Sequence, residues 1–92
     1  MLKVRYSSQF KKDVKLAQKR HLPLDELKIV IQQLANEEQL DEKYRDHALT
    51  GKYTSFRECH VHPDWLLIYR IEDGCCTLIA QRTGTHSDLF GL

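Results

Sequence analysis

The chain has 92 residues, with 41% hydrophobic and 29% charged side chains, an ordinary composition for one globular domain. A chain of this length folds around a single thin core, which excludes a dinucleotide-binding fold or a barrel enzyme. The 14 Lys and Arg residues and 13 Asp and Glu residues give a net charge of +1, so the overall charge does not indicate a protein that captures nucleic acid through its net field. We expect a single domain over residues 1–92.

The sequence offers no sign of export or membrane insertion. No apolar run approaches the roughly 20 residues of a membrane-spanning helix, and the first residues lack the apolar core of a signal peptide. Cys59, Cys75 and Cys76 form an odd set without C-x-x-C spacing, which is typical of reduced thiols. These features predict a cytoplasmic protein with no membrane contact.

The first half of the chain predicts one short strand and two helices. Residues 2–6 are rich in β-forming side chains, and Ser7 and Ser8 are candidate N-caps for a helix over about residues 8–20. Pro23 opens a second amphipathic segment, over about residues 24–37, with two acidic residues in its first turn. Both segments repeat apolar residues every three or four positions, as a helix packed on one face requires.

The second half changes to the two-residue period of strands. We predict strands at about residues 53–61, 65–71 and 77–82, with a hairpin turn at residues 73–74. The segment 65–71 is apolar at odd and even positions alike, so both of its faces should be buried and it should be the central strand. The expected fold is a small α+β sandwich of order β-α-α-β-β-β, mostly antiparallel, with both helices on one face and the tail from residue 83 folding back to the sheet.

Histidines gather in this second half together with acidic and basic partners. A meander of strands could bring His60, Asp64 and His86 to one edge of the sheet, while His47 lies in a loop before the first strand of the meander. Histidine exchanges protons near neutral pH, and RNA cleavage without a metal needs a base for the ribose 2′-hydroxyl, an acid for the departing 5′-oxygen and a cation for the phosphorane. The same residues also fit ordinary structural roles in loops and turns.

Two other kinds of site deserve comparison with this one. His60 and His62 would share one side of a regular strand, and His86 or Cys59 would complete a metal site. We favour this less, because Cys59 would point to the opposite face and the spacing resembles no structural zinc motif. A cysteine nucleophile has still less support, since only the adjacency of Cys59 and His60 suggests one.

The near-neutral charge hides a segregation along the chain. Residues 1–28 hold eight Lys or Arg against three acids, whereas residues 29–50 hold two against five. One side of the first predicted helix carries a basic stripe of Lys11, Lys12, Lys15 and Lys19. This stripe fits a solvated helix face, a contact with the phosphates of a large RNA, or the docking of an acidic partner.

Three motifs in the second half, taken in order, resemble one known family. They are D-H-x-L-x-G at residues 46–51, H-V-x-P-D-W at residues 60–65 and R-T-G-T-H-x-x-L-F at residues 82–90. Residues 13–20 also look like the first helix of the same proteins. Essentially the whole chain is therefore similar to the YafQ-like branch of the RelE/ParE toxin superfamily.

The resemblance implies a toxin of a type II toxin–antitoxin system that enters the ribosomal A site and cuts messenger RNA without a metal or other cofactor. It further implies neutralisation by a DinJ/RelB-like antitoxin, and contact with operator DNA only through the antitoxin complex. The positions that match catalytic residues of the branch are His47, His60, Asp64 and His86. Of these, His86 matches the proton donor to the leaving oxygen.

The resemblance also assigns the substrate contacts. Arg82 matches an arginine that binds the scissile phosphate, and Trp65 and Phe90 match aromatic residues that orient the message. His62 departs from the branch, where an acidic residue is usual. With an extra histidine at this turn, the general base is left open between His60 and Asp64.

Another class of function is compatible with the same superfamily. The chain could be a non-nuclease member, similar to the ParE toxins that poison DNA gyrase, or an inactive binding module with the toxin fold. A gyrase-binding protein has no need of the histidine set. That set therefore favours the nuclease.

Overall fold

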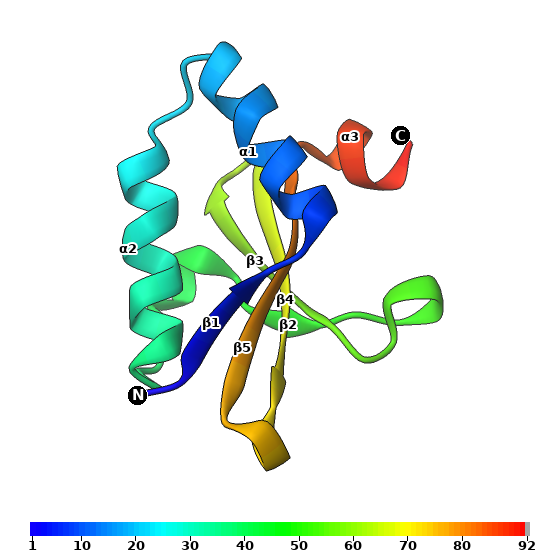
Figure 1. Ribbon diagram of the computed structural model, residues 1–92. Helices are drawn as coiled ribbons and strands as arrows, with labels where there is room; N and C mark the ends of the chain where they lie inside the picture. Colours follow the sequence, from blue (N-terminus) through cyan, green and yellow to red (C-terminus); the bar gives the residue numbers. More distant parts are fainter. Residues whose placement is uncertain (92) are drawn as a thin grey trace.

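The computed structural model describes residues 1–91, so Leu92, the last residue of the predicted tail, lies outside the described residues. Figure 1 shows the order of the elements along the chain. The helices and strands are β1 (Lys3–Tyr6), α1 (Ser8–Lys19), α2 (Leu24–Ala35), β2 (His47–Ala48), β3 (Arg57–His62), β4 (Trp65–Glu72), β5 (Thr77–Gly84) and α3 (His86–Phe90). Short 3₁₀ turns cover Glu42–Tyr44 (η1), Gly51–Tyr53 (η2) and Asp73–Cys75 (η3).

The strands form one sheet in the order β1-β5-β4-β3-β2, so the prediction that β4 lies centrally is confirmed. Among the described strands, only the pairing of β1 with β5 is parallel, which confirms the mostly antiparallel α+β fold. The strand predicted to start at residue 53 begins instead at Arg57, because Gly51–Tyr53 close a 3₁₀ turn. The expected loop at His47 is also wrong, since His47 and Ala48 pair with β3 as an edge strand.

Helices α1 and α2 pack on the same face of the sheet, as the amphipathic periodicity predicts. The Ser7 side chain caps α1 by accepting a hydrogen bond from the Phe10 backbone N–H at 2.9 Å. The second helix ends at Ala35, two residues before the predicted limit. Within residues 1–91, no helix has the length and apolar character needed to span a bilayer.

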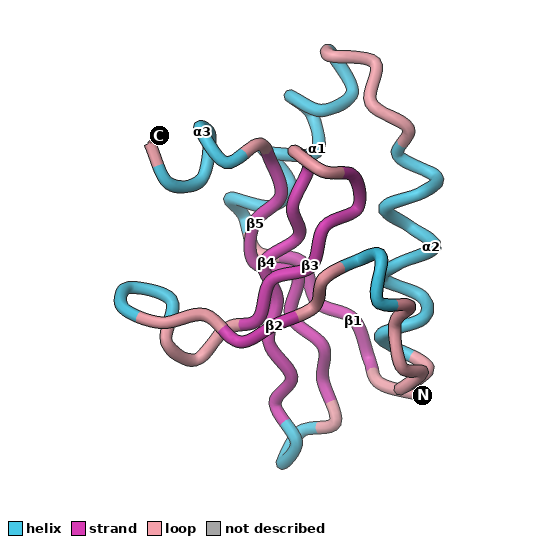
Figure 2. Tube along the Cα trace, turned by 180° about the vertical axis from the view of Figure 1, so that it is seen from behind, coloured by secondary structure: helices cyan, strands magenta, loops and turns pink. Residues whose placement is uncertain are grey.

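The opposite face of the sheet has a smaller hydrophobic cluster. Leu66 and Ile68 of β4 pack there with Leu89 of α3 and with apolar residues of the loop between β2 and β3. Figure 2, which views the molecule from behind, shows that loop and α3 extending away from α2. The tail thus folds back to the sheet as predicted, as a short helix with a capping box between Thr85 and Asp88.

Helix α1 also binds the end of β5 and the start of α3 through charged side chains. Asp13 is buried and accepts three hydrogen bonds. They come from Arg82 Nε at 2.8 Å, from Arg82 Nη2 at 3.2 Å and from the Thr83 backbone N–H at 3.1 Å. At the other end of α1, Arg20 donates to Asp88 at 2.7 Å. The Arg20 guanidinium, followed by the Thr85 backbone N–H, lowers the pKa of Asp88 to about 2.

The two isoleucines of β4 provide a matched test of the second cluster. Ile68 is 0% exposed and Ile71 is 39% exposed in the same strand. We expect Ile68→Ala to lower the free energy of unfolding by about 2–5 kcal/mol, because it leaves a cavity under α3. Ile71→Ala should lower it by less than about 1 kcal/mol. Urea denaturation of both variants measures these values, and equal losses would contradict the packing of this face.

The Arg20–Asp88 pair makes a pH-dependent contribution to stability. A carboxyl whose pKa is lowered in the folded state stabilises the fold above its unfolded pKa, and this stabilisation is lost as the pH falls from about 4 to about 2. We therefore expect the difference in unfolding free energy between wild type and Arg20→Ala to shrink over that range. Arg5→Ala, an exposed arginine on β1, is the control. A difference that stays constant between pH 6 and pH 2 would show that the pair does not stabilise the fold.

Candidate active site

Three histidines converge on the sheet face opposite α1 and α2. Strand β3 alternates, so that Cys59 points into the core under the helices and His60 points to the opposite face. The His86 ring, at the start of α3, meets the His60 ring edge-on with centroids 5.6 Å apart. The His47 ring, on β2, lies 6.3 Å from that of His60. His60 is thus the centre of a row of three imidazoles.

Asp64 fixes the His86 end of this row. It lies in the turn between β3 and β4, and its Oδ1 accepts from the His86 backbone N–H at 3.1 Å and contacts His86 Nδ1 at 2.6 Å. The hydrogen bond from the His86 side chain, and then the one from its backbone, lower the pKa of Asp64. A carboxylate that accepts from Nδ1 keeps a proton on that nitrogen and leaves Nε2 as the exchanging atom.

Glu58 lies beneath the row and is a residue that the sequence analysis missed. It is 5% exposed, and its Oε2 is 2.9 Å from His47 Nε2 and 3.7 Å from His60 Nε2. Its Oε1 is buried with no hydrogen-bond partner among residues 1–91. The available signal was its position two residues before His60, because side chains two apart on a strand share a face.

His47 is oriented from both sides of its ring. Its Nδ1 lies 2.7 Å from the Arg45 carbonyl oxygen, which can only accept, so this nitrogen carries a proton. The contact between Nε2 and Glu58 then requires one more shared proton, either on the imidazole or on the carboxyl. In both cases the His47–Glu58 pair has no net charge. The antiparallel pairing of His47 with Glu58 across β2 and β3 explains this contact.

The structure does not bring every predicted residue to this cluster. Arg82 points toward α1, where Asp13 holds its guanidinium, and Asp13 together with Tyr53 raises the pKa of Arg82. Trp65 is 2% exposed within the core under the helices, so its ring is not open to a stacking base. Phe90 is partly exposed on α3 and meets the Tyr53 ring edge-on at 5.9 Å.

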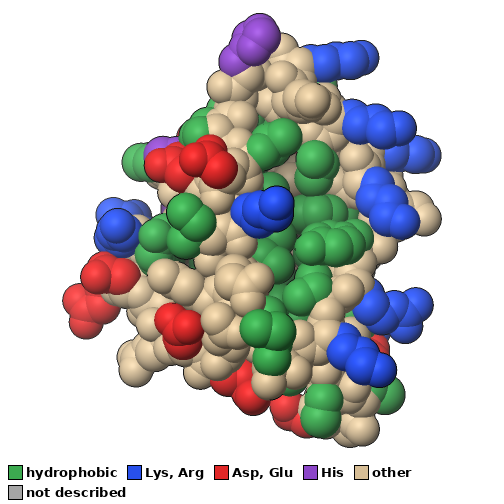
Figure 3. Space-filling view, turned by 60° about the vertical axis from the view of Figure 1, so that its left-hand side comes forward, with side chains coloured by type: hydrophobic (Ala, Val, Ile, Leu, Met, Phe, Trp, Pro, Cys, Tyr) green, Lys and Arg blue, Asp and Glu red, His purple; other side chains and the backbone are tan. Residues whose placement is uncertain are grey.

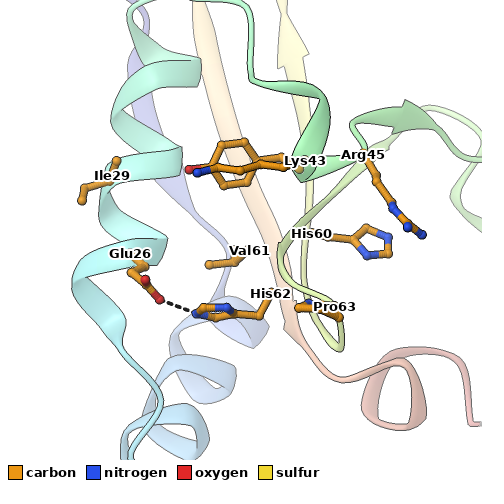
Figure 4. Close-up of a pocket in the computed structure, with 9 residues that line it drawn as sticks. Glu26, Ile29, Lys43, Arg45, His60, Val61, His62 and Pro63 are labelled. Atoms are coloured by element: carbon orange, nitrogen blue, oxygen red, sulfur yellow. Dashed lines mark hydrogen bonds and ion pairs between the residues drawn. The ribbon is translucent and has the colours of Figure 1, made fainter.

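A β-bulge changes the metal site that the sequence suggested. The register shifts between His60 and His62, and His62 turns toward α2, where it contacts Glu26 and stacks on Trp65 at 6.0 Å. Figure 4 shows His60 and His62 pointing to different sides of the strand. The expectation that they share a face is therefore wrong.

A different set of side chains could hold a metal ion. Ligand atoms of Glu58, His60 and His86 all lie within 4.8 Å of one another. Two imidazoles and one carboxylate suit a transition metal. Cys59 is a free thiol buried in the core, and burial raises its pKa, so it is neither a ligand to this set nor an activated nucleophile.

The basic stripe lies apart from the histidines. Its four lysines are exposed on α1, and they are Lys11, Lys12, Lys15 and Lys19. Figure 3 views the helix face and shows basic side chains in a row along one side, with hydrophobic side chains gathered in the middle. The hydrophobic patch corresponds to a shallow groove between α1 and α2, lined by residues such as Phe10, Leu24 and Ile31.

Known proteins resemble this chain over nearly its whole length. The mRNA interferase toxin YafQ of Escherichia coli (strain K12) is 47% identical over 89 residues, covering 96% of this chain and 95% of that protein. A crystal structure of the E. coli DinJ-YafQ complex contains a chain with a TM-score of 0.89 and 46% identity, covering 99% of this chain and 100% of that chain. A metal-bound toxin from Helicobacter pylori has a TM-score of 0.92 and 44% identity, covering 98% and 100%.

The family model described as the bacterial toxin of type II toxin–antitoxin systems, YafQ, matches residues 2–91. The motifs that suggested this resemblance include the site residues His47, His60, Asp64 and His86. The chain therefore belongs to the YafQ family of type II toxin–antitoxin toxins.

Proposed function

We propose that this toxin is an endoribonuclease that cleaves messenger RNA in the ribosomal A site by metal-independent general acid–base chemistry. The observation that carries the proposal is the contact of His86 Nδ1 with Asp64 at 2.6 Å, with the His60 ring 5.6 Å from that of His86. This arrangement offers one imidazole held for proton donation beside a second imidazole. The E. coli relative that shares 47% of its residues with this chain is an mRNA interferase, which supports the same activity.

His86 is the proposed general acid. Asp64 accepts from its Nδ1, which fixes the orientation of the ring and leaves Nε2 as the nitrogen that exchanges a proton. A proton from Nε2 reaches the departing 5′-oxygen as the bond between phosphorus and that oxygen breaks. The leaving group is then a neutral 5′-hydroxyl rather than an alkoxide, which lowers the barrier.

His60 is the proposed general base, in preference to Asp64. Asp64 is engaged by two hydrogen bonds from His86, and its lowered pKa makes it a weak base. The His60 ring takes the 2′-hydroxyl proton as the 2′-oxygen bonds to phosphorus, which leaves a 2′,3′-cyclic phosphate on the upstream product. Glu58, 3.7 Å away and buried, stabilises the imidazolium that forms.

Arg82 is the cationic group proposed to stabilise the phosphorane, because it has donors that Asp13 does not use. His47 cannot serve in the same way, since the Arg45 carbonyl and Glu58 engage both of its ring nitrogens. Phe90 and Tyr53 offer ring surface for a base of the message. Trp65, which the sequence analysis placed with Phe90, instead supports the turn from inside the core by stacking under His62.

The proposed partners follow from different surfaces. Complexes of the E. coli relative with DinJ support an antitoxin of the DinJ class for this toxin, with operator DNA bound only through the antitoxin. The basic stripe of α1 is proposed to contact ribosomal RNA, because four exposed lysines on one helix match a phosphate backbone. The ribosome then presents the message to the histidine face.

Substitution of His86 tests the acid directly. We expect His86→Ala to reduce cleavage of a translated reporter message by about 10²- to 10⁴-fold, because the 5′-oxygen loses its proton donor. His21→Ala, at an exposed position after α1, is the matched control and should cleave like wild type. Undiminished cleavage by His86→Ala would show that another group is the acid.

Chelation separates the proposed chemistry from metal catalysis. A metal bound by Glu58, His60 and His86 would occupy the nitrogens that must exchange protons, so cleavage should persist in EDTA. Loss of cleavage in EDTA that Zn²⁺ restores would show that the metal carries the reaction. Intact message together with an induced DNA-damage response would instead favour a gyrase poison.

Charge reversal on α1 tests the ribosome contact. Lys12→Glu combined with Lys15→Glu should weaken co-sedimentation with ribosomes at low salt and reduce cleavage of translated message, because two phosphate contacts become repulsive. The histidine cluster is untouched in this variant. Reversal of Lys28 on α2 is the control. If ribosome binding and cleavage are unchanged in the double variant, the stripe is a solvated helix face.

A further inference from the structure

A groove of about 500 Å³ lies beside the histidine row, between α2, η1 and β3. Strand β2 pairs only with Arg57 and Glu58 of β3, so the following residues of β3 have no strand on that side. His60 is part of this groove and also the centre of the histidine row. A molecule bound in the groove would therefore touch the proposed base directly.

The two ends of the groove differ in charge. Arg45 and Lys43 line it from η1 and the residue that follows, and neither forms an ion pair with any of residues 1–91. At the other end Glu26 of α2 contacts His62 through its Oε2, which leaves Oε1 able to accept. Figure 4 shows Arg45 near His60 and Glu26 on the far side beside His62.

The backbone at Arg45 is strained in a way that serves this arrangement. Arg45 has φ 50° and ψ 43°, the left-handed conformation that side chains other than glycine rarely adopt. This conformation turns the Arg45 carbonyl onto His47 Nδ1 and leaves its side chain on the groove. Such strain persists where the surrounding structure holds it, and it is concentrated at functional sites.

The middle of the groove is apolar. Ile29 of α2 is 52% exposed there, Val61 and Pro63 line the β3 side, and the Tyr44 ring is half-buried. The volume lies within the roughly 300–1000 Å³ range of small-ligand pockets. An aromatic base fits between apolar walls, while a sugar phosphate fits the cationic end.

We propose that this groove binds the nucleotide next to the cleaved bond, with its phosphate on Arg45 and its base directed toward Glu26. Free Oε1 of Glu26 accepts from the exocyclic amino group that adenine and cytosine carry at this edge of the base. Uracil has a carbonyl oxygen at the same place, which the carboxylate repels, so adenine and cytosine are preferred over uracil. This inference rests on the proposed nuclease function and adds to it a subsite that selects the base beside the cut.

Binding can be measured without cleavage. The probes are 2′-O-methyl RNA trinucleotides of adenosine, cytidine or uridine, which lack the 2′-hydroxyl proton that the reaction needs. In ¹⁵N-labelled protein we expect the adenosine and cytidine probes to shift the amide signals of Tyr44, Arg45 and Val61. The uridine probe should bind roughly five- to tenfold more weakly.

Two substitutions divide the subsite into its parts. Arg45→Gln should weaken all three probes by roughly five- to tenfold, whereas Glu26→Gln, whose amide can also donate to a uracil carbonyl, should abolish the preference with little loss of binding. Lys28→Gln, on α2 but outside the groove, is the control for lost charge. Thermal unfolding of each variant verifies that the fold is retained.

Several outcomes would overturn the subsite. They are amide shifts confined to His60, His86 and Phe90, equal binding of all three trinucleotides, or displacement of the probe by tripolyphosphate at the same concentration. Mapping of cut sites in a translated message gives a second measurement: unchanged sites and rates in Arg45→Gln and Glu26→Gln would also overturn it. In each of these cases wild-type cleavage continues, so the proposed nuclease stands. Absence of wild-type cleavage would instead refute the proposed function.

Discussion

Strand β4 is buried on both of its faces, and this burial determines where the polar site can form. The run from Trp65 to Tyr69 has no residue more than 2% exposed, so both faces of the sheet need an apolar cover. Helices α1 and α2 provide a large cover on one face, whereas the other has only α3 and the loop between β2 and β3. Among the described residues 1–91, no further helix or strand completes the second cover. The end of β3 is left open there, and Glu58, His60 and His86 occupy it.

Side chains of the helix-covered face hold the elements of the open face in place. Asp13 on α1 is buried and binds both the side chain of Arg82 and the backbone of Thr83, next to the junction of β5 and α3. Arg20, the C-cap residue directly after the same helix, binds Asp88 of α3. A buried carboxylate is costly unless it is paired and hydrogen-bonded, and Asp13 meets both conditions. The position of His86 at the start of α3 therefore depends on a helix that lies on the other side of the sheet.

The elements that the sequence predicts well are those whose apolar pattern is long. The two helices and the central strand each repeat apolar residues over several positions, and packing leaves one arrangement for them. Strand β2 has two residues, too few to show any period, and its existence depends on pairing with β3. The bulge at His60 and His62 is likewise a property of the paired strands. The sequence of residues 60–63 is equally compatible with a regular strand and does not predict it.

The same limits apply to the site. The sequence makes His60, Asp64 and His86 candidates because a meander of strands could bring these three positions to one edge of the sheet. Glu58 has a weaker signal, its spacing of two residues from His60, because a glutamate in a strand usually faces solvent. The pairing of β2 with β3 is what places it beneath His47 and His60. Trp65 is the opposite case. Its motif position matches a substrate contact, but the ring is buried in the core, where it stabilises the fold more than it would at the surface.

The net charge of +1 is best understood as the sum of separate local fields. The α1 lysines face outward on one side, while Arg45 and Lys43 lie beside the histidine row on the other. Within the row each acidic group contacts an imidazole, as in the His47–Glu58 and His86–Asp64 pairs, so the row has no strongly positive field. A strongly positive cleft would bind RNA phosphates wherever it met them, and the attraction would extend over about a Debye length, roughly 8–10 Å. A row without a strong positive field, with a few cations at its margin, instead binds an RNA strand that has already been positioned. Delivery of the message by a ribosome would create that condition.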